Sequence, residues 1–103
     1  GQAVAAAKSI QDLFESDRHK IESFGKASSS MLVVHHYLQR HPIAEAKNIV
    51  SSCNLSLPTV NNALGNLEEI GIVEEITGKL RNKIYVYKKY LDTLSEGTSL
   101  TQD

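Results

Sequence analysis

The sequence predicts a mainly α-helical domain that closes on a small β-hairpin. Apolar residues recur at helical spacing over the first two thirds of the chain. The pattern then changes to stretches rich in β-branched and aromatic residues on either side of a polar, glycine-bearing turn. The 103 residues suffice for one domain with one modest core.

A first helix is expected from Ala3 to Phe24, where alanines favour helix and a narrow apolar stripe repeats. Gly25 stands where a C-terminal cap is expected. The stripe needs a surface to lie on, because such a helix is not stable alone. We therefore expect residues 1–27 to form a linker helix, covered by a preceding domain or by a second copy of the chain in a homodimer.

Three further helices should follow. Serines 28–30 offer N-caps for a helix from about Met31 to Arg40, and a short helix is expected from Glu45 to Ser52. The fourth is expected from an N-cap at Ser56 to Ile70, with proline in its first turn and glycine after its end. The last two are joined by too few residues to run antiparallel, so they should cross steeply.

The β-hairpin is expected from strands at Ile72–Thr77 and Lys83–Tyr87. A short closing helix at Tyr90–Leu94 and a flexible tail at 97–103 complete the chain. This order of elements over residues 28–96 is that of a winged helix-turn-helix domain, with the hairpin as its wing.

The apolar stripes also predict a core, in which the wing turns one face inward and leaves Tyr85 and Tyr87 on the other. The expected core residues are Val34, Leu38, Ile49, Val60, Leu64, Leu67, Ile70, Ile72, Ile76, Ile84 and Val86.

Composition and motifs argue against an enzyme. Cys53 is the only cysteine, and the adjacent His35 and His36 point apart, so we expect no disulfide, no metal site, and histidines that are exposed or half-buried. The glycines form no phosphate-binding motif, and nothing indicates a cofactor or a small-molecule substrate. No apolar run reaches a membrane span and no signal peptide is visible, so a cytoplasmic location is expected. The start at Gly1 indicates a piece of a longer protein.

The candidate binding residues lie on the fourth helix and the wing. The helix should expose small polar side chains and the wing carries three cations; together they are Thr59, Asn61, Asn62, Asn66, Lys79, Arg81 and Lys83. Asparagine can read adenine and cations can contact phosphate, which favours DNA as partner. The net charge of −1 and the absence of cations on the helix favour a protein partner instead. Both remain open.

The recognition-helix segment SLPTVNNAL and the following LEEIGIVE are similar to those of many bacterial regulators. The continuation ITGK, RNKIYVY and YLD resembles the C-terminal winged-helix domain of Fic-family proteins (filamentation induced by cyclic AMP). The resemblance covers about Met31 to Leu94. It implies a parent protein that transfers AMP from ATP to protein hydroxyls, with residues 1–27 as the last helix of its catalytic domain. The family's catalytic signature, H-P-F-x-x-G-N-G-R, is absent: His41-Pro42 is followed by Ile43. The resemblance therefore implies a non-catalytic accessory domain that binds DNA or docks on a protein.

Overall fold

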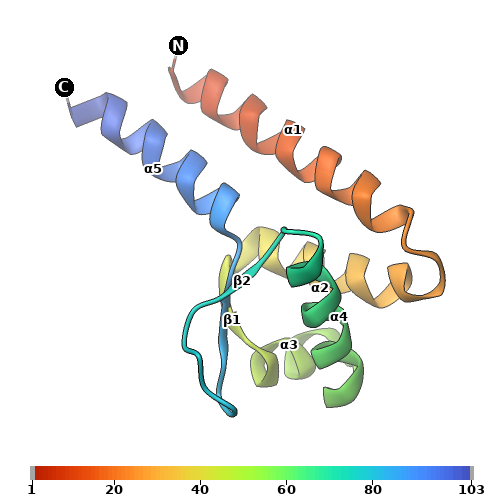
Figure 1. Ribbon diagram of the computed structural model, residues 1–103. Helices are drawn as coiled ribbons and strands as arrows, with labels where there is room; N and C mark the ends of the chain where they lie inside the picture. Colours follow the sequence, from red (N-terminus) through yellow and green to blue (C-terminus); the bar gives the residue numbers. More distant parts are fainter. Residues whose placement is uncertain (1, 103) are drawn as a thin grey trace.

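The computed structural model describes the backbone of residues 2–102 and the side chains of residues 7–96 (Figure 1). It confirms a mainly α-helical fold with a small antiparallel sheet that forms a wing. The elements in chain order are α1 (Gln2–Glu22), the 3₁₀ turn η1 (Gly25–Ala27), α2 (Ser28–Arg40), β1 (Ile43–Glu45), α3 (Ala46–Cys53), α4 (Leu57–Glu69), β2 (Glu74–Glu75), β3 (Ile84–Val86) and α5 (Lys88–Gln102).

The fourth helix has the ends that the sequence predicts. The backbone N–H of Thr59 donates to Ser56 Oγ at 3.3 Å, and Pro58 lies in the first turn, where its missing N–H costs nothing. Gly71 follows the last turn with a positive φ of 85°. One face of α4 packs against α2 and α3 through its buried side chains, which are Val60, Ala63, Leu64 and Leu67.

The sheet has one more strand than the sequence predicts. The order is β1-β3-β2, so β1 pairs with the far strand of the wing and Ala44 lies opposite Tyr85. We expected only a short extended link at Ile43. Three residues carry too weak a pattern to predict a strand without its partner, and here that partner lies about 40 residues further on.

The predicted register of the wing is wrong. Tyr85 and Tyr87 turn into the core, and Tyr87 is 0% exposed, whereas Ile76 is 56% exposed. Ile84 is half-buried, and Val86 is buried as expected, at 8% exposed, but is not one of the residues that form the core cluster. Side chains alternate between the faces of a strand, so the inward tyrosines put the isoleucines and Val86 on the outer face. The buried hydroxyl of Tyr87 finds partners inside, as described below.

Two predicted helix boundaries are also wrong. α2 begins at Ser28, not Met31, because η1 runs into it without a break and Ala27 is already helical. The serines therefore do not cap it: Ser28 Oγ donates back to the carbonyl of Gly25 at 2.7 Å. The closing helix runs from Lys88 to Gln102, not Tyr90 to Leu94, so the expected tail has helical backbone to Gln102. Its flexibility remains a prediction.

Helix α1 lies along α2 and α5 (Figure 1). Ile21 is fully buried, and the half-buried Leu13, Phe14 and Phe24 pack on the same core. The apolar stripe of α1, which we expected another domain or a second copy to cover, is thus covered within the chain. The boundary between residues 27 and 28 falls inside one continuous core, and the proposed division into linker and domain remains a prediction.

Candidate nucleic-acid interface

A groove of about 640 Å³ separates α4 from the wing. The inner face of the wing forms one wall and the exposed face of α4 the other. Its lining residues are Glu45, Ala46, Lys47, Leu57, Asn61, Gly65, Glu68, Leu80, Arg81, Asn82, Lys83 and Tyr85. The register of β3 explains the wing's contribution, because Lys83 and Tyr85 are two apart and so share the inner face.

Three of the seven predicted binding residues meet in this groove, namely Asn61, Arg81 and Lys83. Asn62 and Lys79 are exposed but outside its lining, on α4 and in the wing turn. Thr59 and Asn66 are half-buried and lie on another flank of α4.

The hydroxyl of Thr59 is also engaged, since it accepts a hydrogen bond from Ser56 Oγ at 2.8 Å. This residue therefore serves the helix cap. Sequence periodicity showed which side of α4 is free, but not which part of the free side faces the wing.

The wing turn is shaped by the carboxylate of Glu75. Its Oε2 accepts hydrogen bonds from the backbone N–H and the hydroxyl of Thr77, and the N–H of Gly78 donates to it at 3.0 Å. These bonds lower the pKa of Glu75, and the bond from the Thr77 hydroxyl has the largest effect. Gly78 and Asn82 bracket the turn with positive φ angles of 67° and 54°. The Glu75 carboxylate thus fixes the segment that carries the three cations.

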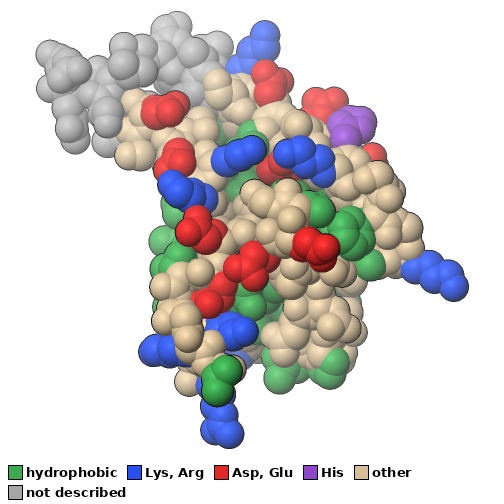
Figure 2. Space-filling view, viewed as in Figure 1, with side chains coloured by type: hydrophobic (Ala, Val, Ile, Leu, Met, Phe, Trp, Pro, Cys, Tyr) green, Lys and Arg blue, Asp and Glu red, His purple; other side chains and the backbone are tan. Residues whose placement is uncertain are grey.

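The wing cations form no ion pair with a described carboxylate, although the charge of Lys83 helps to lower the pKa of Glu75. No described carboxylate lies within 4.0 Å of the charged nitrogens of Lys79, Arg81 or Lys83. Figure 2 shows Lys and Arg side chains gathered over the wing, with acidic side chains above them over α4 and β2. Partners of opposite charge can therefore reach the wing without first displacing an ion pair.

The two carboxylates in the groove are already engaged. Glu45 pairs with Lys47 at 3.7 Å, and Glu68 Oε2 accepts the backbone N–H of Glu75 at 3.2 Å. These contacts lower the repulsion that an anionic ligand would meet. Glu45, Lys47 and Glu68 were not among the predicted groove residues, because helical periodicity does not show which residues face the wing.

Two leucines stand exposed at the groove. Leu80, at the tip of the wing, is 97% exposed, and Leu57, in the first turn of α4, is 50% exposed. An exposed leucine is common on protein surfaces, but two beside one groove add an apolar component to it.

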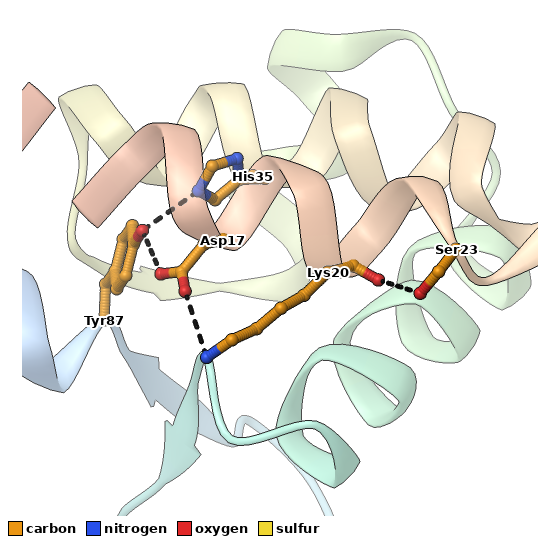
Figure 3. A network of polar contacts seen from close by, with 5 residues as sticks. All are labelled: Asp17, Lys20, Ser23, His35 and Tyr87. Atoms are coloured by element: carbon orange, nitrogen blue, oxygen red, sulfur yellow. Dashed lines mark hydrogen bonds and ion pairs between the residues drawn. The ribbon is translucent and has the colours of Figure 1, made fainter. Parts of the chain in front are cut away.

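A second cluster, which the sequence analysis missed, lies inside the protein (Figure 3). The hydroxyl of Tyr87 donates to Asp17 Oδ2 at 2.6 Å and lies 3.0 Å from His35 Nε2. Asp17 and His35 are 1% and 2% exposed, so the expectation of an exposed or half-buried His35 was wrong. Separations of 52 and 70 residues along the chain leave no local signal for these contacts.

Comparisons with known proteins identify no family. No protein-family model matches the chain, and no curated protein shows a significant match. Among the described residues, no three His, Cys, Asp or Glu side chains come together as metal ligands. No helix in the described part of the chain has the length and apolarity needed to cross a membrane.

Proposed function

We propose that this chain is a non-catalytic winged-helix module that binds DNA through the groove between α4 and the wing. One observation carries the proposal: Lys79, Arg81 and Lys83 extend from a fixed turn, with no described carboxylate within 4.0 Å, beside the exposed asparagines of α4. By its resemblance, the module would belong to a cytoplasmic Fic-family protein.

The proposed binding mode follows from the two walls of the groove. α4 would enter the major groove with Asn61 and Asn62 towards the base edges, where an amide can pair with adenine. The wing cations would contact phosphates. Three such contacts give a slope of about −2.7 for log K against log salt, and an affinity on the order of 10⁻⁴–10⁻⁶ M, as for non-specific binding.

Fluorescence anisotropy with a labelled random duplex tests this mode. Replacing Lys79, Arg81 and Lys83 with alanine should nearly abolish binding at low salt. A matched control replaces Lys8, Lys26 and Lys89, which are exposed cations outside the groove. The control loses the same net charge, so it should keep most of the affinity. Equal losses in both variants would overturn the assignment to the wing.

Protein docking is the second candidate function, and the exposed Leu57 and Leu80 favour it. Apolar anchors beside charged groups are typical of protein interfaces. In the presumed parent, the module would then hold a target or the catalytic domain. If the unmodified chain fails to bind duplex at about 10⁻⁴ M protein and low salt, the DNA proposal falls and this candidate replaces it.

A further inference from the structure

The buried cluster joins three elements that are distant in sequence. Asp17 comes from α1, His35 from α2, and Tyr87 from the link between β3 and α5. All three are nearly inaccessible to solvent, and the Tyr87–Asp17 hydrogen bond connects α1 to the sheet side of the molecule. Figure 3 shows the three side chains converging beneath α1, with Lys20 beside Asp17.

The hydrogen positions follow from the number of donors. Tyr87 has one hydroxyl hydrogen, and it goes to Asp17 at 2.6 Å. The contact of 3.0 Å to His35 Nε2 is therefore a bond in which the imidazole donates and the tyrosine oxygen accepts. Nδ1 is left as the acceptor for the amide of Gln39 at 3.3 Å. His35 thus fits the cluster as the neutral Nε2–H tautomer.

We propose that this cluster is an acid-sensitive latch, which holds α1 on the winged-helix core while His35 is neutral and releases it when His35 takes up a proton. A second proton must go to Nδ1. It would meet the amide hydrogens of Gln39, so that this bond breaks or the amide turns over. It also places a positive charge in a buried site, beside the rings of Phe14 and Tyr87 and a carboxylate, that of Asp17, which Tyr87 and Lys20 already engage.

The charges that face His35 act in both directions. Asp17 on α1 favours the protonated form, but its oxygens are shared with the Tyr87 hydroxyl and with the ammonium of Lys20 at 3.7 Å. Arg18 on α1 and His36 on α2 disfavour it. From the β3–α5 side, burial raises the pKa of Tyr87, so its hydroxyl stays neutral, and Tyr90 adds an aromatic ring. Burial is the largest influence, and the pKa of His35 lies below its ordinary 6.5.

The lowered pKa of His35 determines whether acid stabilises or destabilises the fold. A histidine with a lowered pKa in the folded state stabilises the fold fully above pH 6.5, and the stabilisation is lost as pH falls through the shifted pKa. Release should affect α1 first. α1 joins α2 through η1 and Gly25, whose φ of 80° marks a change of chain direction. None of the three cluster residues lines the groove, which should stay folded.

The test follows side-chain methyl and histidine-ring signals by NMR from pH 7.5 to 5. Ile21 reports on α1, and the fully buried Ile49 in α3 reports on the helix-turn-helix core. We expect the Ile21 methyl to shift with the midpoint of the His35 ring, below 6.5, while Ile49 stays unchanged. Below that midpoint the closed population should fall about tenfold per pH unit.

Two variants complete the experiment. His35→Gln keeps a neutral donor for Tyr87 and should remove the transition at Ile21. His36→Gln, the exposed neighbour, should leave it in place. An Ile21 transition that survives in His35→Gln, that coincides with carboxylate titration near pH 4, or that is absent down to pH 5 in the unmodified chain would overturn the latch. The unmodified chain decides the question even if His35→Gln does not fold.

Discussion

At the scale of single residues, the hydroxyl of Tyr87 satisfies two buried polar groups at once. Replacing Tyr87 with phenylalanine keeps the ring but leaves Asp17 and His35 without this partner. Each unsatisfied group costs about 1–3 kcal/mol, so the free energy of unfolding should fall by at least about 2 kcal/mol. Urea denaturation at pH 7.5 measures it. Tyr90→Phe, in the same aromatic cluster, is the control and should change little. Equal losses in both variants would contradict the role of the Tyr87 hydroxyl.

Leu64 tests the core of the helix-turn-helix. It is fully buried between α4 and its neighbours, so Leu64→Ala should open a cavity and cost about 2–5 kcal/mol. Leu57→Ala, on the exposed side of the same helix, makes the same change in side-chain volume and should cost far less. Thermal melts of both variants compare them. If the melting temperature falls no more in Leu64→Ala than in Leu57→Ala, Leu64 does not contribute to the core as described.

At the scale of elements, α4 could be predicted closely and the sheet could not. Caps, proline position and a 3.6-residue period are local signals, and they placed α4 within one residue of its observed ends. Which face of the wing turns inward depends on whether a tyrosine hydroxyl finds a buried partner, here on α1 and α2. The formation of β1 depends on its pairing with β3, far along the chain. The groove could likewise be predicted only in part: the sequence indicated its cations, but not its carboxylates or the exposed Leu80.

Two glycines, one inside α4 and one just after its end, should respond differently to replacement by alanine. Gly65 lies inside α4, and a Cβ there would meet nothing within 4 Å. Gly65→Ala should therefore stabilise the protein by about 1 kcal/mol, because alanine favours helix. Gly71→Ala should destabilise it, since Gly71 has a φ of 85°. Calorimetry compares the two. A loss of stability in Gly65→Ala would contradict the open space around Gly65.

At the scale of the whole molecule, α1 belongs to the same core as the helix-turn-helix. The described part of its stripe packs on the core beside α2 and α5, so this stripe does not need a second copy to cover it. We predict that the chain sediments as a monomer at pH 7.5 in analytical ultracentrifugation. A concentration-dependent dimer at that pH would show that another surface associates; the outer sheet face with Ile43 and Ile76 would then be examined first.

The central claim is that the face between α4 and the wing binds DNA, and amide NMR of the labelled chain titrated with duplex at low salt tests it most directly. We predict perturbed signals at Asn61, Gly65, Arg81 and Lys83, and unchanged signals along α1 and the outer sheet face. The perturbations should disappear as salt rises, because phosphate contacts are screened. Saturable shifts confined to α1 or to the outer face, or no shifts at all with excess duplex, would contradict the claim.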